Sequence, residues 1–256
     1  MGVVLLVRIR IDEQIYDIDG ILFDKDGTLL DFHTLWMGWS KDIIDAICLK
    51  MNLQQVHQKE MATSIGVDWQ EDSWDVEGPL AIGTTQDLIT LLAHQLYVLN
   101  IPWNTAFKLV TDTFIEVNRL DNWKKRVKEM PGLKRFVKKC YERNLHLGVV
   151  TSDDHDHAVK HLKQLGIHSY FQAFIGGDQV THGKPFPESA ELACAQMNVN
   201  PSRMLVIGDS DGDMVFGNNI SAMANIGVVS NTNETKHFHH ADHLIRSYDE
   251  ITFDEK

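Results

Sequence analysis

The sequence predicts an α/β fold in which a parallel sheet with helices on both faces carries an inserted, mainly helical segment. Three observations lead to this prediction. From residue 131 onward, short apolar runs alternate with segments of helical periodicity. Between residues 32 and 128, the apolar residues recur mainly at helical spacing. Polar side chains directly follow the apolar runs, at the strand ends where open parallel sheets bind their ligands.

The core elements follow one another in a regular order. The first strand is expected at residues 20–23, before a sharp turn from Asp24 to Gly27. Pro131 and Gly132 then open a helix that ends at Asn144. Its inward residues are expected to be Leu133, Phe136, Val137, Cys140 and Tyr141. Further strands are predicted at residues 145–150, 171–175, 204–207, 225–229 and 243–245, and helices at 157–165, 188–197 and 214–224.

The inserted segment shows several apolar helical faces. Ile43, Ile44, Ile47 and Met51 share one face, and two later faces are formed by Leu88, Leu91, Leu92, Leu96 and Leu99, and by Phe107, Val110, Phe114 and Val117. Residues 66–85 are rich in Gly, Asp, Trp and Thr and show no periodicity. We expect an irregular loop there, since such long loops are often lids or binding loops.

Composition excludes several classes of protein. The 256-residue chain has 43% hydrophobic and 23% charged residues, which is typical of a globular protein. Its formal net charge of −12 argues against nucleic-acid binding, which requires clustered Lys and Arg. Cys48, Cys140 and Cys194 show neither a disulfide framework nor a metal-binding spacing.

The opening run, MGVVLLVRIR, is interrupted by Arg8 and Arg10 and has no small-residue cleavage site. It therefore predicts a first strand or an ordered arm rather than a signal peptide. No apolar run has the length of a membrane span. We expect a cytoplasmic protein without a membrane partner, and leave the oligomeric state open between monomer and homodimer.

The polar residues at the strand ends form a chemically specific set. They comprise Asp24 and Asp26 after the first strand, Thr151 and Ser152 after the second, Lys184 after the third, and Asp209 and Asp213 after the fourth. This set offers a nucleophile, a proton carrier, hydroxyl donors, a cation and carboxylates for a hard divalent ion. A similar sequence, DIDG at residues 17–20, lacks the following Thr and precedes the strand, so we do not assign it to the site.

Four segments carry a family resemblance. FDKDGTLLDF, VVTSD, GKPFPE and VIGDSDGDM resemble, in order, the four motifs of the haloacid dehalogenase superfamily. The phosphoglycolate phosphatase-like branch is the most similar. The resemblance implies a Rossmann-like catalytic core formed by residues 1–31 and 129–256, and a helical cap at residues 32–128. Lys25 departs from that branch, where the residue between the two aspartates is often apolar.

The resemblance also implies roles for individual residues. Asp24 is the nucleophile that forms an aspartyl-phosphate, and Asp26 carries the proton. Mg²⁺ is bound by the carboxylates of Asp24 and Asp209 and the backbone carbonyl of Asp26, with Asp213 in support. Thr151 and Ser152 bind phosphate, as does Lys184, which offsets charge during transfer. Gly27 lets the backbone come close to the phosphate.

Each assignment has a structural alternative. Asp209 is also suited to cap a helix, as is Thr151, and Lys184 to be a surface cation. Asp211 is expected to be a solvent-exposed loop residue. The HFHHADH segment at residues 237–243 has ligand-like spacing, but lacks a matching cysteine or carboxylate, so we do not predict a zinc site. His155 and His157 are expected to be solvated.

Three residues of the inserted segment are candidate substrate contacts. His33 sits near the start of the segment, and a packing role fits it equally. Thr84 and Thr85 are candidates for choosing the leaving group, while Thr85 is also suited to be a helix N-cap. Hinges are expected near Asp31 and Glu129.

The predicted function is that of a magnesium-dependent phosphatase acting on a small phosphorylated metabolite, of the phosphoglycolate or sugar-phosphate kind. A phosphotransferase of the hexose-phosphate mutase kind shares the four motifs and remains the alternative. A regulatory module that has lost turnover is disfavoured, because both Asp24 and Asp26 are present.

Overall fold

The computed structural model describes residues 7–230 and 235–254. The chain divides into two compact units. The residues up to Asp31 and those from Glu129 onward form the first, which we call the core unit. Phe32–Lys128 form the second, which we call the insert.

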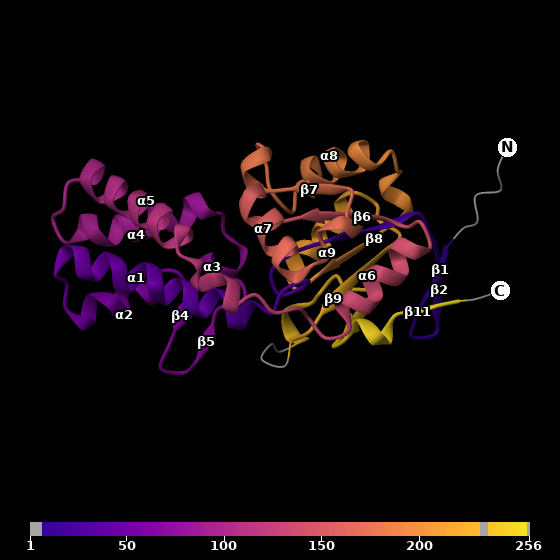
Figure 1. Cartoon of the computed structure of the whole chain (residues 1–256), viewed down its shortest axis with the longest axis horizontal. Coiled ribbons are helices and arrows are strands. Elements are labelled where there is room, and N and C mark those ends of the chain that lie inside the picture. Colours follow the sequence, from indigo (N-terminus) through magenta and orange to yellow (C-terminus); the bar gives the residue numbers. More distant parts are fainter. Residues whose placement is uncertain (1–6, 231–234, 255–256) are drawn as a thin grey trace. The chain divides into compact units, whose positions relative to one another are not determined.

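A parallel sheet organises the core unit, and this confirms the predicted fold class (Figure 1). Among the described residues the sheet has six strands in the order β10-β9-β8-β3-β6-β7, and every neighbouring pair is parallel. The strands are β3 (Gly20–Phe23), β6 (His146–Val150), β7 (Ala173–Ile175), β8 (Met204–Gly208), β9 (Ala224–Val228) and β10 (His243–Ile245). All four residues of β3 are buried, as expected for a central strand covered on both faces.

Helices cover both faces of this sheet. On one face, α8 (Glu188–Met197) and α9 (Asp211–Asn219) pack in a cluster with Leu22, Val150 and Val206. On the other face, Phe23 contacts Phe136 of α6 (Leu133–Glu142). A further helix of the core unit, α7 (His155–Leu165), connects β6 to β7. Successive strand residues point to opposite faces, so Leu22 and Phe23 serve different layers.

One residue of α6 differs from its predicted place. Tyr141 was expected to point inward, but it is 49% exposed, and its ring contacts that of Tyr170 instead. Leu133, Phe136, Val137 and Cys140 already complete the buried stripe. Tyr141 therefore falls at the edge of the stripe, where an amphipathic ring is well accommodated.

A second, antiparallel sheet was not predicted. It has the order β11-β1-β2, with β1 (Val7–Ile11), β2 (Gln14–Ile18) and β11 (Thr252–Phe253). The first six residues of the predicted opening strand or arm lie outside the described residues. In this region Asp17 pairs with Arg8 at 2.9 Å, and Asp19 accepts two hydrogen bonds from Arg203. The carboxylates of the DIDG sequence thus have structural partners.

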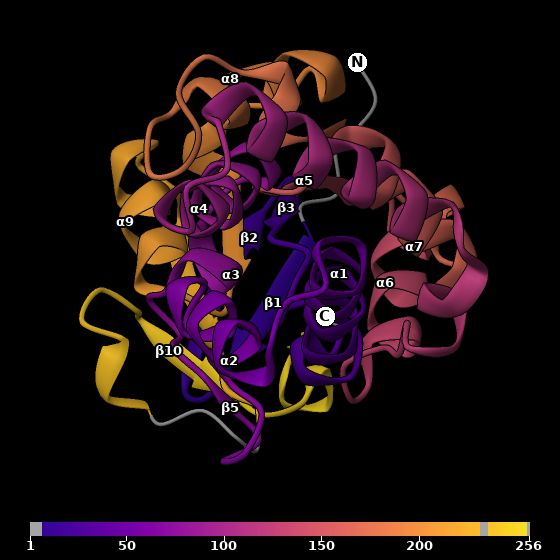
Figure 2. The same ribbon diagram turned by 90° about the vertical axis from the view of Figure 1, so that its left-hand side faces the viewer.

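The insert is a helical bundle with its own core (Figure 2). A π-helical turn (His33–Met37) leads into α1 (Gly38–Met51), followed by α2 (Gln55–Ser64), α4 (Thr85–Val98) and α5 (Trp103–Arg119). The predicted apolar faces supply this core, which includes Ile43, Leu92 and Val110. Within the described part of the chain, no helix combines the length and apolarity that crossing a membrane requires.

Residues 66–85 are more regular than expected. They form a short hairpin of β4 (Val67–Asp68) and β5 (Ser73–Trp74), followed by the helical turn α3 (Pro79–Ile82). Trp74 stacks on Phe32 with 5.0 Å between ring centroids, and the Asp68 carboxylate accepts the backbone N–H of Gln70. Elements of two to four residues are too short to show periodicity in a sequence.

Candidate active site

The carboxyl ends of three adjacent strands bring the predicted site residues to one edge of the sheet. In β3, Phe23 is in register with Val149 of β6 and with Ile207 of β8. The residues that follow, Asp24, Thr151 and Asp209, therefore emerge at the same edge. The backbone N–H of Asp24 donates to the carbonyl of Ile207 at 2.8 Å, which extends the ladder to the candidate nucleophile.

Lys184 joins two carboxylates at this edge. Its Nζ lies 2.5 Å from Oδ1 of Asp24 and 2.6 Å from Oδ1 of Asp213. Lys184 is 12% exposed at its side chain, Asp24 is 9% and Asp213 is 3%. Lys184 is thus part of the buried site, and the alternative of a surface cation is wrong.

Asp213 is held in place by the start of α9. Ser210 caps this helix: its Oγ accepts the N–H of Asp213 and donates to Asp213 Oδ2 at 2.6 Å. This reciprocal pairing is a capping box, and it fixes the carboxylate that Lys184 contacts. The N-cap is therefore Ser210 rather than Asp209, and the helix begins three residues before its predicted start at residue 214.

Asp209 lies against the turn that follows Asp24. Gly27 has φ +81°, and a Cβ atom at Gly27 would lie 1.8 Å from Oδ2 of Asp209. Both the backbone conformation and this close approach require glycine. Asp24, Asp209 and Asp213 each offer one oxygen, and the three oxygens lie within 4.8 Å of one another. That arrangement suits a hard divalent cation.

The electrostatics of this group show an excess of negative charge. Burial, together with Asp213 and Asp26, outweighs the effect of Lys184 and raises the pKa of Asp24 to about 7. Burial and the neighbouring Asp24 raise the pKa of Asp209 well above its usual value. The pKa of Lys184 is raised, because its two carboxylates outweigh its burial. Three carboxylates facing one ammonium leave room for a further cation.

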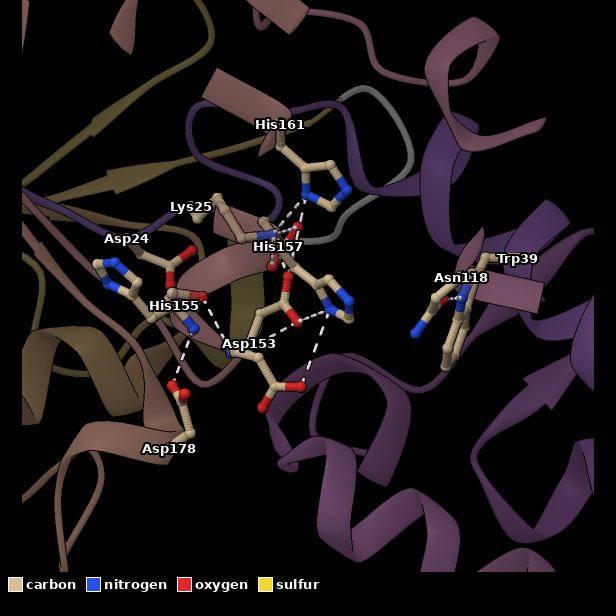
Figure 3. Close-up of polar contacts among 12 residues, drawn as sticks. Asp24, Lys25, Trp39, Asn118, Asp153, His155, His157, His161 and Asp178 are labelled. Carbon is tan, nitrogen blue, oxygen red and sulfur yellow. Dashed lines mark hydrogen bonds and ion pairs between the residues drawn. The ribbon is translucent and has the colours of Figure 1, made fainter. Parts of the chain in front are cut away.

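Asp26 faces a second lysine. Lys25 is fully buried, and its Nζ lies 2.6 Å from each carboxylate oxygen of Asp26. The same Nζ lies 3.0 Å from Oδ2 of Asp153 and 3.4 Å from Nδ1 of His161 (Figure 3). In the sequence Lys25 departs from the family pattern, but its partners are not evident there. The available signal was the acidic run after Thr151, which offers counter-charges for a buried lysine.

Two histidines of α7 complete this second cluster. His157 Nδ1 lies 3.2 Å from Oδ1 of Asp153, so it was wrong to expect a solvated side chain. Burial lowers the pKa of His157, but the hydrogen bond and the charge of Asp153 raise it by more. The net effect is a raised pKa. Burial and the charge of Lys25 lower the pKa of His161 to about 3. The pKa of Asp153 is lowered, since Lys25 and His157 outweigh its burial. Asp153 is therefore an ionised, buried anchor.

The remaining core residues lie where the strand ends place them. Thr151 is 5% exposed, and its Oγ1 accepts the backbone N–H of Asp153 at 3.1 Å. The N-cap of α7 is Asp154, so the alternative of Thr151 as a cap is wrong. Ser152 follows Thr151 and is half-buried. His155 is bound through its backbone N–H to Asp178 and through Nδ1 to the carbonyl of Phe174, which places it in the structure rather than in solvent.

The three candidates in the insert contact other residues of the insert. His33 Nε2 lies 2.8 Å from Oδ1 of Asp72. Thr84 is the N-cap of α4, where its Oγ1 accepts the N–H of Asp87 and donates to Asp87 Oδ2. Thr85 is the first residue of α4, so the alternative of Thr85 as the N-cap is wrong by one residue.

The histidine-rich segment has partners that the sequence did not reveal. His240 Nδ1 lies 2.8 Å from Oδ2 of Asp211, and His243 Nδ1 lies 2.7 Å from Oδ2 of Asp12. Asp211 also accepts the N–H groups of His239 and His240, so it is not a solvated loop residue. The histidines thus have carboxylate partners, contrary to expectation, but each partner lies in a different part of the core unit.

Comparison with known proteins places this chain in a family. Residues 18–220 match the model of the haloacid dehalogenase-like hydrolases. The pyrophosphatase PpaX of Oceanobacillus iheyensis is 28% identical over 90% of this chain and 94% of its own. A phosphorylated carbohydrates phosphatase of Thermotoga maritima is 26% identical over 86% and 89%.

Solved structures agree on the fold. A haloacid dehalogenase-type phosphatase from Thermococcus onnurineus superimposes with a TM-score of 0.66 and 19% identity. The alignment covers 91% of this chain and 95% of that one. The match of the family model across most of the chain, the similar phosphatases and the shared fold lead to one conclusion: this chain belongs to the haloacid dehalogenase-like hydrolase family, as an enzyme of the phosphatase type.

Proposed function

We propose that this enzyme is a magnesium-dependent phosphatase that hydrolyses a small phosphate monoester through an aspartyl-phosphate on Asp24. The observation that carries the proposal is the buried Asp24 carboxylate, bound at 2.5 Å by Lys184 among three carboxylates at the ends of β3 and β8. A carboxylate nucleophile replaces one difficult displacement by two easier ones.

In the first step, a carboxylate oxygen of Asp24 attacks phosphorus, and the bond between phosphorus and the leaving oxygen breaks. Asp26, protonated, gives its proton to the leaving oxygen, so the product departs as an alcohol. Lys184 offsets the charge on the nucleophile and on the phosphoryl oxygens, and Thr151 donates a hydrogen bond to one of these oxygens.

In the second step, water attacks the phosphorus of the aspartyl-phosphate. Asp26, now a carboxylate, accepts a proton from this water, and the bond between phosphorus and the Asp24 oxygen breaks. Inorganic phosphate leaves, Asp24 is again a carboxylate and Asp26 is again protonated. The residue pair thus returns to its starting state, as a catalytic cycle requires.

The donor set fits a magnesium ion. Asp24 and Asp209 would hold it with the backbone carbonyl of Asp26, and Asp213 would support them from its place beside Lys184. All of these are oxygen ligands, the kind that Mg²⁺ prefers. When bound, the ion neutralises charge on the phosphoryl oxygens and on the carboxylates. The pKa values of Asp24 and Asp209 are raised by burial and by the neighbouring carboxylates, and a bound cation would stabilise the ionised form of both groups.

The proposed substrates are small phosphorylated compounds. Relatives named for pyrophosphate and for phosphorylated carbohydrates define the first compounds to try, together with phosphoglycolate. The contribution of His33, Thr84 and Thr85 to substrate choice stays a prediction.

The test is inorganic-phosphate release from a panel of these compounds, with and without magnesium. We expect magnesium-dependent release, reduced at least about 10⁴-fold in Asp24→Asn, since replacing a nucleophile removes the covalent route. Asp17→Asn is a matched control, because Asp17 occupies the similar DIDG sequence and pairs with Arg8. It should retain the parent rate.

Two results would redirect the proposal. Turnover that survives in Asp24→Asn would contradict the aspartyl-phosphate. A phosphorylated Asp24 that can be trapped, but that releases phosphate only to a second sugar phosphate, would favour the phosphotransferase alternative.

A further inference from the structure

We propose that Lys25 is a positioning residue for catalysis: anchored on Asp153, it holds the carboxyl group of Asp26 where that group exchanges a proton with the leaving oxygen. This inference deepens the proposed function and rests on it. It assigns a task to the residue between the two aspartates, a position at which the sequence departs from its branch of the family.

The first support is the geometry around the ammonium group. Lys25 Nζ lies 2.6 Å from both oxygens of Asp26, so it contacts the whole carboxylate edge rather than one atom. Its backbone is equally constrained, because the Lys25 carbonyl accepts the N–H groups of Leu29 and Leu30 in the turn after the strand. The side chain of Lys25 is fully buried, whereas that of Asp26 is 14% exposed. Lys25 therefore supports Asp26 from the protein side.

The second support is the rigidity of the anchor. Asp153 Oδ2 lies 3.0 Å from Lys25 Nζ, and Asp153 Oδ1 accepts the N–H of Asp154 at 2.8 Å. The backbone N–H of Asp153 donates to Thr151 Oγ1, and its carbonyl accepts the N–H of Gly177. Asp153 is thus fixed by bonds at both its backbone and its side chain. A lysine bound to such a group has little freedom to follow a mobile carboxylate.

The third support comes from charge balance. One buried carboxylate is enough to neutralise a buried ammonium, and Asp153 already provides it at 4% exposure. If Lys25 only stabilised the fold, its ion pair with Asp153 would be sufficient, and a second ion pair with Asp26 would not be required. The contact of Lys25 with the proposed proton carrier therefore indicates a purpose in the reaction.

A metal site is the competing explanation for this cluster. Asp153, Asp154 and His157 have ligand atoms within 4.8 Å of one another. However, the Lys25 ammonium already lies against Asp153, and Asp153 also accepts a hydrogen bond from a backbone N–H (Figure 3). The cation that the Asp153 carboxylate binds is therefore the Lys25 ammonium rather than a metal ion.

The main experiment is a double-mutant cycle on phosphate release. Lys25→Met, which keeps the length of the side chain, should lower kcat about 10- to 100-fold with KM nearly unchanged, as expected when a catalytic group is misplaced. Because Lys25 acts through Asp26, Lys25→Met combined with Asp26→Asn should be no slower than Asp26→Asn alone. If the two losses multiply, Lys25 does not act through Asp26 and the proposal is overturned.

A second variant separates positioning from stability. In Lys25→Met/Asp153→Asn, both members of the buried ion pair become neutral, so the Tm should recover toward that of the parent. The loss in kcat should remain, because Asp26 has still lost its support. Recovery of kcat along with Tm would show that Lys25 is merely structural.

A third readout uses the leaving group. Lys25→Met should slow an alkyl phosphate more than p-nitrophenyl phosphate, because nitrophenolate departs without a proton. An equal loss on both substrates would contradict the proposal.

The outcome for Asp26→Asn keeps the two proposals apart. If Asp26→Asn turns over as fast as the parent, the proposed role of Asp26 fails, and the role of Lys25 fails with it. If Asp26→Asn is slow but Lys25→Met is as fast as the parent, the phosphatase mechanism stands and only the Lys25 proposal is overturned.

Discussion

Lys184 and Lys25 of the core unit each lie among carboxylates, but their surroundings differ in charge. Lys184 lies with Asp24, Asp209 and Asp213, which gives two carboxylates in excess when all are ionised. Lys25 lies with Asp26 and Asp153, with one carboxylate in excess, and His157 offers a further positive charge. The shifts follow this difference, because the pKa of Asp24 is raised to about 7 while that of Asp153 is lowered.

This difference separates a cluster with an excess of negative charge from one in which the charges are closer to balance. In the Lys184 cluster the neighbouring carboxylates disfavour one another's ionised forms, which adds to the effect of burial on the pKa values of Asp24 and Asp209. In the Lys25 cluster the charges are nearly balanced, because one ammonium lies against two carboxylates and His157 lies 3.2 Å from one of them. Burial alone therefore does not decide the behaviour of a carboxylate, since the balance of neighbouring charges sets the direction of its pKa shift.

The strongest test of this comparison replaces one carboxylate from each cluster. Asp153→Asn should lower the free energy of unfolding by about 3 kcal/mol, because it breaks a buried ion pair and leaves Lys25 with only the more exposed Asp26 as its counter-charge. Asp209→Asn should raise it by about 1 kcal/mol in the metal-free protein, since it removes a repulsive charge beside Asp24. Urea unfolding with a chelator present measures both.

Changes of opposite sign in the free energy of unfolding of these two variants would support the distinction between the clusters. Loss of stability in both would show that the excess charge of the Lys184 cluster is already relieved without a cation. Asp17→Asn serves as the surface reference, with a change within about 0.5 kcal/mol.

A smaller effect is expected from the neutral histidine beside Lys25. Burial and the charge of Lys25 lower the pKa of His161 from its ordinary value of 6.5 to about 3 in the folded protein. Below pH 6.5 the unfolded chain therefore binds a proton that the folded protein does not, so stability is lost as the pH falls from 6.5 toward 3. His161→Gln should remove this part of the acid sensitivity, a difference in slope that amounts to about 1–3 kcal/mol by pH 4.

The measurement is the free energy of unfolding at several pH values for parent and variant. His94→Gln is the control for a histidine substitution, because His94 is exposed on α4. If the curves of parent and His161→Gln run parallel between pH 6.5 and 4, His161 is not held neutral by burial and Lys25.

The smallest effect concerns a helix cap outside both clusters. Thr84→Ala removes the N-cap of α4 and should cost about 1 kcal/mol of stability, whereas Thr85→Ala should cost less because Thr85 does not cap the helix. Thermal unfolding of the two variants measures these small changes in stability, with which the larger changes expected at the buried charges can be compared. Their relative kcat/KM across the phosphate panel tests the predicted substrate contact, which unchanged preferences in both variants would exclude.

Most of the core arrangement was predictable because it depends on local signals. The alternation of apolar strands and amphipathic helices predicts the parallel sheet, and polar residues after each strand predict where Asp24, Lys184 and Asp213 meet. The first strand, at residues 20–23, agrees with β3 at both ends. Boundaries were less predictable where side-chain caps decide them, as Ser210 does for α9.

The partners of buried charges were not predictable, because they depend on contacts distant in sequence. Lys25 and Asp153 are separated by more than a hundred residues, and the pairs His243 with Asp12 and Arg203 with Asp19 are separated by more still. The antiparallel sheet was missed for the same reason, since β1 pairs with β11 from the far end of the chain. Patterns of period two or 3.6 carry no information on such pairings.

The capping box of Ser210 and Asp213 links catalysis to local unfolding. The same carboxylate that closes the first turn of α9 contacts Lys184, which in turn contacts Asp24. Fraying of that single turn would therefore remove one of the two carboxylates that hold Lys184, the proposed catalytic ammonium, without unfolding the sheet. The amide hydrogens of Ser210 and Asp213, both bonded within the box, become natural reporters of active-site integrity. Their exchange with deuterated solvent would show how often the site disassembles in the otherwise folded enzyme.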